Sequence, residues 1–455
     1  MKTTDIKFFR SPSLGHLIKP YSRFPLQSFG QKKCPKGFHG PDSYRGSGLN
    51  SIVIETNELR KKSAISLKFS LLFFFISTFI FAQQVNFDSG KVQQKKYLEE
   101  ITFEEINNKI IIPVQINGKS YRFLLDIGAP NLISKELYES LNTTKSDSIP
   151  VNDASNLNQN MVATTISQIQ IGNLIFENQV ALVFDIKQHK LLECHQIDGF
   201  IGSNLFKNSI LKISRSQGKI TITDQIKLLK PKTKPSKLKL VGFQKAPYVQ
   251  FYLFGSKNAI DYVLIDTGMD GYYDMANRNF DIFQKTNIFE VIASSKGIGG
   301  IGLFGASEPS EQKLINVKNG SIGRKKFQNI FIKTTDDNNS RIGLDFFNHG
   351  EVIIDFKNKK VYFEGKTNIQ MNEVVPKFQP TVVNEKFVIG LVWDPELAQK
   401  IYFGDEIISI DGIKIEDIEF CNIFSFRKQL QDKKQYVIEI KTSGNQIINI
   451  EIDNP

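Results

Sequence analysis

Two stretches of the chain repeat one pattern of apolar and polar positions, about 140 residues apart. In the first stretch, the apolar run Ile110 to Ile116 passes through an Asn-Gly hairpin turn to a second strand that ends at Asp126. In the second stretch, Tyr248 to Phe254 passes through a Gly-Ser turn to a strand that ends at Asp266. This repeat predicts two similar β-rich units within one chain.

A second landmark follows each aspartate at nearly the same distance. Phe200-Ile201-Gly202 is the landmark of the first copy, and Arg341-Ile342-Gly343 is that of the second copy. From the aspartate to the glycine is 76 residues in the first copy and 77 in the second. Agreement at two independent landmarks indicates a true internal repeat. Further strands are expected after each landmark, over residues 210–213, 220–223, 352–356 and 361–363.

Both copies resemble the retropepsin-like and pepsin-like aspartic proteases. The residues that carry the resemblance are Asp126-Ile127-Gly128 and Asp266-Thr267-Gly268, each after an apolar strand, together with the elements that end at Gly202 and Gly343. The resemblance covers roughly residues 105–365. Both copies lie in one chain, as in the pepsin-type enzymes, so it implies that no homodimer is required to build the site.

The resemblance implies an all-β-dominated, bilobal fold with two retropepsin-like β-barrel lobes. We expect the first lobe at residues 83–226 and the second lobe at residues 240–366. The segment between them, residues 227–239, is rich in Lys and contains two Pro residues, which is typical of a linker. An exposed basic strand edge fits the same residues.

The resemblance makes Asp126 and Asp266 the catalytic pair of an aspartic endopeptidase, with Gly128, Thr267 and Gly268 as supporting residues of the two loops. Two carboxyl groups about 3 Å apart cannot both ionise, so they share a proton and titrate as a pair. The charged member can take a proton from water while the protonated member donates to a peptide carbonyl oxygen. This chemistry requires a polypeptide substrate and neither a metal nor a cofactor.

The first loop departs from the family at Ile127, where the family has Thr or Ser. In the family this hydroxyl bonds to the backbone of the partner loop, and Ile has no group that can replace it. Thr267 keeps the hydroxyl in the second loop. Because catalysis tolerates little misplacement of its groups, two functions stay open: an active protease, or a catalytically inactive relative that only binds peptides.

A glycine-rich run from Lys296 to Gly305 lies about 30 residues after Asp266 and resembles the flap of a retroviral protease. Glycine supplies the turn geometry and mobility that such a lid needs. A phosphate-binding loop is not indicated, because no Lys-Ser/Thr pair follows. The flap of the first copy is expected near Asn152 to Ala163, which is polar and glycine-free, so the two flaps differ. The expected substrate-binding residues of the glycine-rich flap are Ile298, Gly299, Gly300 and Ile301.

Residues 375–455 are expected to form a separate C-terminal module. Gly404 to Gly412 resembles the most recognisable stretch of a bacterial PDZ domain, which implies a PDZ-like β-sandwich with short helices at Pro395 to Lys400 and Phe424 to Gln431. A PDZ groove binds an extended peptide by strand addition, so a peptide ligand is an expected partner. No Gly-Leu-Gly-Phe-like signature lies at residues 381–386, and a purely structural module remains the alternative. Its other strands are expected over residues 387–392, 436–442 and 446–452.

The net charge of +11 lies mostly at the N-terminus. Residues 1–82 carry 13 Lys or Arg and 4 Asp or Glu, which leaves the remaining chain with a net charge of only +2. A nucleic-acid partner is therefore not indicated, because it requires a basic face on the folded part. The chain is 40% hydrophobic and contains 37 Phe, which is enough apolar material to bury a core.

The leader, residues 1–82, ends in a segment typical of a secretory signal peptide. Within about residues 60–82, several Lys and Arg precede an apolar run that ends in Ala82. The run is shorter than the roughly 20 residues of a spanning helix, although an uncleaved membrane anchor stays open. A signal normally starts a chain, so we expect residues 1–60 to be absent from the natural product and the mature chain to begin near Gln83. The protein is therefore expected to be exported, to the periplasm, the cell envelope or the medium.

The three cysteines give little guidance. Cys34, Cys194 and Cys421 show neither a CxxC spacing nor a pairing with His, so neither a zinc site nor a disulfide framework follows. At most one disulfide can form.

Overall fold

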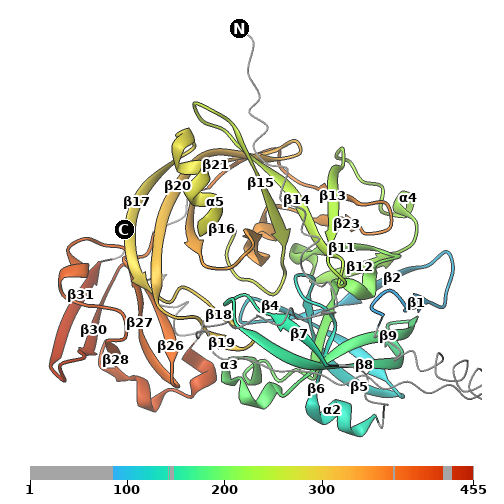
Figure 1. The fold of residues 1–455 in the computed structure, drawn as a ribbon, viewed down its shortest axis with the longest axis horizontal. Coiled ribbons are helices and arrows are strands. Elements are labelled where there is room, and N and C mark those ends of the chain that lie inside the picture. The colour runs from blue at the N-terminus through green and yellow to red at the C-terminus, as the bar shows by residue number, and fades with distance from the viewer. Residues whose placement is uncertain (1–85, 142, 144–147, 372–374, 424–432, 454–455) are drawn as a thin grey trace, which may run out of the picture. The chain divides into compact units, whose positions relative to one another are not determined.

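The described part of the chain is mostly β-structure with a few short helices (Figure 1). The computed structural model describes residues 86–141, 143, 148–371, 375–423 and 433–453. The expected leader and signal peptide therefore lie outside the described residues. Within the described ranges, no helix has the length and apolar character needed to span a bilayer.

The first copy of the repeat forms a sheet of nine described strands. The strand order is β1-β9-β6-β10-β5-β4-β8-β7, and β3 pairs with β4. The strands are β1 (Lys91–Val92), β3 (Glu104–Ile106), β4 (Lys109–Ile116), β5 (Lys119–Asp126), β6 (Leu132–Ser134), β7 (Ser148–Asn152), β8 (Asn158–Ile171), β9 (Leu174–Phe184) and β10 (Gly199–Gly202).

The second copy contributes most of a sheet of fourteen described strands, which also takes three strands from the first copy. The main path runs β17-β20-β21-β16-β22-β15-β14-β13-β24-β23-β11-β12-β2, and β25 pairs with β21. The strands are β2 (Leu98–Thr102), β11 (Ile210–Ser214), β12 (Lys219–Thr223), β13 (Ser236–Val241), β14 (Ala246–Leu253), β15 (Ala259–Ile265), β16 (Tyr273–Ala276), β17 (Phe289–Gly297), β20 (Ser310–Ile322), β21 (Lys325–Thr335), β22 (Arg341–Ile342), β23 (Val352–Asp355), β24 (Lys360–Phe363) and β25 (Asn368–Gln370).

Two smaller sheets complete the strands. One pairs β18 (Ile301–Gly302) with β19 (Gly305–Ala306) inside the glycine-rich run. The other is the C-terminal sheet, in the order β26-β27-β28-β30-β31 with β29 beside β28. Its strands are β26 (Phe378–Val383), β27 (Lys386–Val392), β28 (Glu406–Ile410), β29 (Ile413–Lys414), β30 (Gln435–Lys441) and β31 (Ile447–Asp453).

The described helices are short. The α-helices are α2 (Lys135–Ser140), α3 (Lys190–Glu193), α4 (Ile226–Leu229) and α5 (Asn277–Phe283). The 3₁₀ turns are η3 (Ile186–Gln188), η4 (Ser203–Phe206), η5 (Arg215–Gln217), η6 (Gln284–Thr286), η7 (Leu344–His349), η8 (Leu397–Gln399), η9 (Ile415–Asp417) and η10 (Phe420–Asn422).

The two copies position their aspartates in the same way. In the first copy β5 forms a hairpin with β4 and runs parallel to β10, with Leu124 opposite Phe200. In the second copy β15 forms a hairpin with β14 and runs parallel to β22, with Leu264 opposite Arg341. Each aspartate therefore comes at the end of a central strand, which is held by hydrogen bonds on both sides.

One apolar core joins the two copies. It contains Leu125 and Ile127 from the first copy and Ile265 and Ile342 from the second, all fully buried. Burying apolar surface is the main favourable term in folding, and here it fixes the ends of β5 and β15 against the same core. The bounds of the two lobes stay predictions, because the second sheet takes strands from both copies.

The expected linker is only partly irregular. Helix α4 and strand β13 overlap it, and β13 pairs with both β14 and β24. Lys237 and Lys239 therefore lie on a strand that has a partner on each side, so β13 is not an edge strand. The short helix expected at Pro395 to Lys400 is the single turn η8, and the one expected at Phe424 to Gln431 lies outside the described residues.

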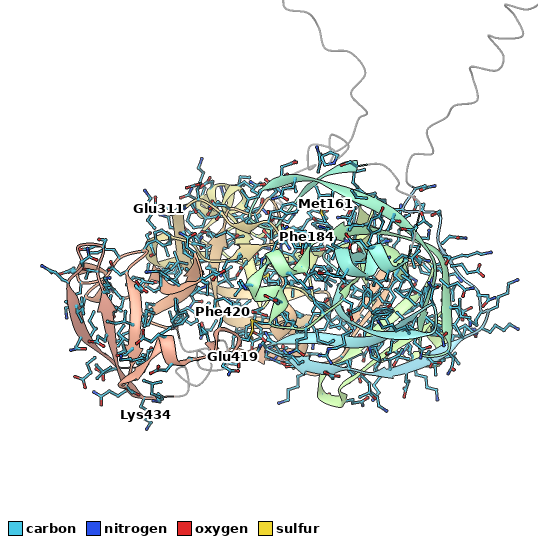
Figure 2. The ribbon with its side chains drawn as sticks, turned by 90° about the horizontal axis from the view of Figure 1, so that it is seen from below. Met161, Phe184, Glu311, Glu419, Phe420 and Lys434 are labelled. Atoms are coloured by element: carbon cyan, nitrogen blue, oxygen red, sulfur yellow. A yellow bond between two sulfur atoms is a disulfide. The ribbon has the colours of Figure 1, made fainter. Side chains whose placement is uncertain are left out.

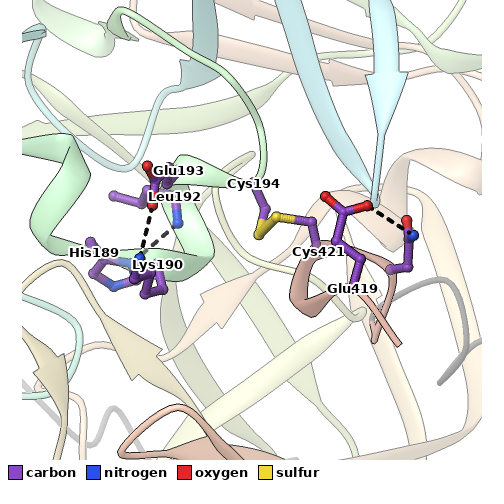
Figure 3. Close-up of a disulfide and its surroundings, with 8 residues drawn as sticks. His189, Lys190, Leu192, Glu193, Cys194, Glu419 and Cys421 are labelled. Carbon is purple, nitrogen blue, oxygen red and sulfur yellow. Dashed lines mark hydrogen bonds and ion pairs between the residues drawn. A yellow bond between two sulfur atoms is a disulfide. The ribbon is translucent and has the colours of Figure 1, made fainter. Parts of the chain in front are cut away.

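The C-terminal module is tied covalently to the first copy. A disulfide joins Cys194, which follows α3, to Cys421 in η10 (Figure 3). Figure 2 shows Glu419 and Phe420, next to this bond, where the module meets the rest of the chain. The module also has its own apolar core, which includes Ile389, Ile407 and Ile438.

Candidate active site

Asp126 and Asp266 lie side by side. A Cβ atom at Gly128 would come within 2.5 Å of the carboxyl carbon of Asp266, and one at Gly268 would come within 2.5 Å of Asp126 Oδ2. Each carboxyl group therefore rests against the backbone of the opposite loop. Both positions require glycine for this close approach, which places the predicted supporting residues Gly128 and Gly268 at the pair itself.

Backbone N–H groups orient the two carboxyl groups. The N–H groups of Gly128 and Ala129 donate to Asp126 Oδ1 at 3.0 and 3.1 Å. The N–H of Gly268 donates to Asp266 Oδ1 at 2.9 Å. These tight turns follow directly from the end of β5 and β15, so the sheet sets the direction of both carboxyl groups.

Thr267 links the two loops. Its hydroxyl donates to the backbone oxygen of Leu125 at 2.6 Å and accepts from the N–H of Ile127 at 3.1 Å. The side chain of Ile127 is fully buried in the apolar core. Among the described residues the link between the loops thus rests on one hydroxyl, where two hydroxyls would form a symmetric pair of links.

The two carboxyl groups have different surroundings. Asp266 is only 3% exposed, whereas Asp126 is partly exposed. The pKa of Asp126 is raised to about 8, first because burial disfavours the charged form, and then because Asp266 lies beside it. Burial and the adjacent carboxyl group therefore both favour a shared proton on the pair at neutral pH.

Arg341 is a buried cation next to the pair. Its guanidinium pairs with the carboxylates of both Asp266 and Asp337, and the three side chains are 16%, 4% and 4% exposed. The sequence pattern places Arg341 in the landmark that ends at Gly343 and assigns it no role. A comparison of the two copies could have singled out Arg341, because the first copy has an aromatic residue, Phe200, at the equivalent position.

A lysine of the first copy contacts the loop of the second. Lys109 Nζ donates to the backbone oxygen of Gly268 at 2.7 Å and pairs with Asp270 at 2.6 Å. Its side chain is 15% exposed. Sequence reasoning missed this contact, because nothing in the pattern around Lys109 distinguishes it from an ordinary surface lysine.

The predicted flap residues form the end of a long hairpin. Strands β17 and β20 are antiparallel and lead into the run that holds Ile298, Gly299, Gly300 and Ile301. Ile298 is 3% exposed, and its N–H donates to the backbone oxygen of Gly390 at 3.3 Å. The backbone oxygen of Gly299 accepts from Lys333 Nζ at 2.5 Å and from Gln379 Nε2 at 3.0 Å. The C-terminal module therefore holds one side of this hairpin.

The other side of the hairpin contacts the first copy. The N–H of Gly302 donates to Ser155 Oγ at 2.7 Å, and the N–H of Phe304 donates to Asp153 Oδ2 at 2.8 Å. Asp153 and Ser155 lie in the turn between β7 and β8, where the flap of the first copy was expected. His189 Nε2 also lies 3.0 Å from the backbone oxygen of Gly302. The two hairpin tips thus meet.

A metal site is not formed by the described side chains. Within those ranges no three His, Cys, Asp or Glu residues are grouped so that they could hold an ion together.

The family match with known proteins lies in the first copy. Residues 112–205 match the family model described as aspartyl protease, a range that includes Asp126 and ends before Asp266. A solved structure, a retropepsin-like aspartic protease from Rickettsia conorii, is 15% identical and covers 30% of this chain and 92% of its own, with a TM-score of 0.20. A search of curated proteins finds no match. Residues 112–205 are therefore similar to the aspartyl protease family.

Proposed function

We propose that this protein is an exported aspartic endopeptidase whose catalytic pair is Asp126 and Asp266. The observation that carries the proposal is the mutual contact of the two loops, in which each carboxyl group rests against the glycine of the other. The aspartyl protease domain supplies Asp126, and the second copy of the pattern supplies Asp266. One chain then builds the complete site without a homodimer.

The chemistry assigns one role to each carboxyl group. Asp266, whose carboxylate pairs with Arg341, takes a proton from a bound water as the water oxygen attacks the peptide carbonyl carbon. Asp126, which holds a proton because its pKa is raised to about 8, donates that proton to the carbonyl oxygen. When the tetrahedral intermediate collapses, the C–N bond breaks and the amine leaves with a proton from the pair. No covalent intermediate is required.

The substrate is a polypeptide bound in extended form beneath the glycine-rich hairpin. Ile298 to Ile301 lie at the end of β17, as expected of a lid. In this structure both sides of the hairpin are engaged, by Gly390 and Gln379 on one side and by Ser155 on the other. A substrate therefore enters only when at least one set of these contacts opens.

The C-terminal module is proposed to be a PDZ-like domain that binds a peptide. Support comes from the Gly404 to Gly412 stretch and from its own sheet and apolar core. Peptides bind such domains by adding a strand to a sheet edge. The module also contacts the glycine-rich hairpin through Gly390 and Gln379. A peptide bound to the module would therefore lie close to this hairpin.

Export is proposed on two grounds. The leader has the features of a signal peptide, and Cys194 is joined to Cys421 by a disulfide. Disulfides persist in oxidising compartments such as the periplasm and the extracellular space, and are rare in the cytosol. The destination is therefore the periplasm, the cell envelope or the medium.

The test is cleavage of a peptide mixture by the purified protein from about pH 3 to pH 9, with and without pepstatin. Asp126→Asn and Asp266→Asn should each abolish cleavage, because each removes one member of the pair. Asp88→Asn is the matched control, since Asp88 pairs on the surface with Lys245 and is 54% exposed. Cleavage that persists in either variant of the pair would refute the proposal.

The second candidate is a peptide-binding protein without catalytic activity. The observation that favours it is Ile127, which leaves the loops linked only through the hydroxyl of Thr267. A folded protein that binds peptides but cleaves none at any pH would support this candidate. Ile127→Thr, which restores the family hydroxyl, would then show whether the missing link is the cause.

A further inference from the structure

Arg341 and Phe200 occupy equivalent positions in the two copies but have opposite character. Phe200 lies opposite Leu124 in β5, and Arg341 lies opposite Leu264 in β15. Leu124 and Leu264 each come two residues before the aspartate of their copy. Phe200 is 5% exposed and belongs to an apolar cluster. The second copy thus places a permanent cation where the first copy places a hydrocarbon ring.

The cation is compensated by two buried carboxylates. Arg341 pairs with Asp266 and with Asp337, and all three side chains are largely buried. A guanidinium does not lose its proton in proteins and offers several donors in a rigid fork. A buried charge is tolerated only when it is paired, so protonating Asp266 would leave Arg341 with half of its compensation.

Other charged groups also face the pair. Arg341 and, to a smaller extent, Lys109 on β4 also lower the pKa of Asp126. Tyr248 on β14 faces Arg341 and Asp266. Asp274 on β16 faces Arg341 and Asp337. Of these groups, Arg341 is the one that pairs directly with a carboxylate of the dyad.

We propose that Arg341 is a positioning residue that keeps Asp266 ionised and so leaves the shared proton on Asp126. This inference rests on the proposed function, because it assigns roles within that dyad. In a symmetric pair the proton has no preferred site, and the two groups titrate together. Here the cation divides the roles before substrate binds, with Asp266 as the base and Asp126 as the acid.

The proposal predicts a shift in the acidic limit of activity, which is the lowest pH at which the protein still cleaves peptides. Activity at low pH is lost when both members of the pair are protonated, and an adjacent opposite charge resists this. Arg341→Phe gives the second copy the residue of the first, and should move the acidic limit of cleavage upward by about 1 to 3 pH units. Arg341→Lys keeps the charge and should move it much less.

Two further variants separate charge from folding. Asp337→Asn removes the outer partner and leaves the Asp266–Arg341 pair, so the acidic limit should stay where it is or move lower. The double variant Arg341→Gln with Asp337→Asn removes both outer charges and leaves no unpaired carboxylate at position 337. It should show the raised acidic limit even if Arg341→Phe fails to fold.

A second readout does not depend on cleavage. Carboxyl-labelled aspartate can be followed by ¹³C NMR through a pH titration of the purified protein and the double variant. We expect the two carboxyl groups of the pair to titrate in two well-separated steps in the unaltered protein, and this separation to shrink in the variant. An unchanged separation, or an acidic limit that does not move, overturns the proposal. Absence of cleavage alone would contradict the proposed function and not this titration.

Discussion

The hydroxyl of Thr267 receives the backbone N–H of Ile127 at 3.1 Å and donates to the backbone oxygen of Leu125 at 2.6 Å. A single side chain of the second loop therefore ties down the first loop on both sides of Ile127. Ile127 has no equivalent hydroxyl, so the second loop supplies both side-chain hydrogen bonds between the loops and the first loop supplies none.

Thr267→Val should lower both stability and peptide cleavage. Valine has the shape of threonine, so the change removes the two hydrogen bonds and leaves the N–H of Ile127 and the oxygen of Leu125 without this partner. Losing a buried hydrogen-bond partner costs about 1 to 3 kcal/mol, which denaturant unfolding can measure.

The matched control is Thr165→Val, an exposed threonine within strand β8. It should change the free energy of unfolding by less than about 0.5 kcal/mol. Equal effects of the two substitutions would show that the link between the loops does not stabilise the protein.

Cleavage should decline above about pH 8, because Asp126 then loses the proton that it donates. The free energy of unfolding should decline between about pH 4 and pH 8. The pKa of Asp126 is about 8 in the folded protein against an ordinary value of 3.8. Between these values the folded state binds more protons than the unfolded state, so the free energy of unfolding falls as pH rises. Below the ordinary pKa this contribution is fully present.

Comparing the unaltered protein with Asp126→Asn isolates this effect. Asp261 and Asp274 also have raised pKa values because of burial, and they remain in both proteins. The variant should therefore lose less stability between about pH 4 and pH 8 than the unaltered protein. Parallel stability curves in denaturant would show that Asp126 does not hold its proton.

Breaking the disulfide should loosen the C-terminal module. Cys194 and Cys421 are 227 residues apart in sequence, so the bond closes a long loop and restricts the unfolded chain. Removing such a bond costs about 2 to 5 kcal/mol. Cys194→Ser with Cys421→Ser should lower the melting temperature, and a reducing agent should have no further effect on that variant.

Gly297→Ala should separate the glycine-rich hairpin from the C-terminal module. A methyl group at Gly297 would overlap the backbone oxygen of Gly390, the same oxygen that accepts from Ile298. We expect faster hydrogen exchange at the Ile298 amide and a lower melting temperature. At Gly300 a methyl group would meet nothing within 4 Å, so Gly300→Ala should change neither quantity.

The strands and the pair of aspartates follow closely from the pattern of apolar residues. Strand β4 is observed at Lys109–Ile116 and was expected at Ile110 to Ile116, and β27 is observed at Lys386–Val392 and was expected at residues 387–392. Local alternation and turn residues determine such elements. The contact of Asp126 with Asp266 could be anticipated only because the repeat placed both at the same point of the same pattern.

The contacts made across the fold could not be read from the chain. Nothing near Arg341 in the sequence indicates that Asp266, 75 residues earlier, is its partner. The same holds for Cys194 and Cys421, and for the hydrogen bond from Ile298 to Gly390. These pairs depend on how separate elements dock, and docking is set by the whole core rather than by local spacing.

The equivalence of Phe200 and Arg341 bears on how the chain could have arisen. In an enzyme assembled from two identical subunits, any substitution appears twice, so an arginine at this position would bring two cations to one pair of aspartates. A gene that encodes both copies in tandem escapes this restriction, because each copy mutates alone. The asymmetry proposed for the two aspartates is therefore open to one chain with two copies and closed to an assembly of identical subunits.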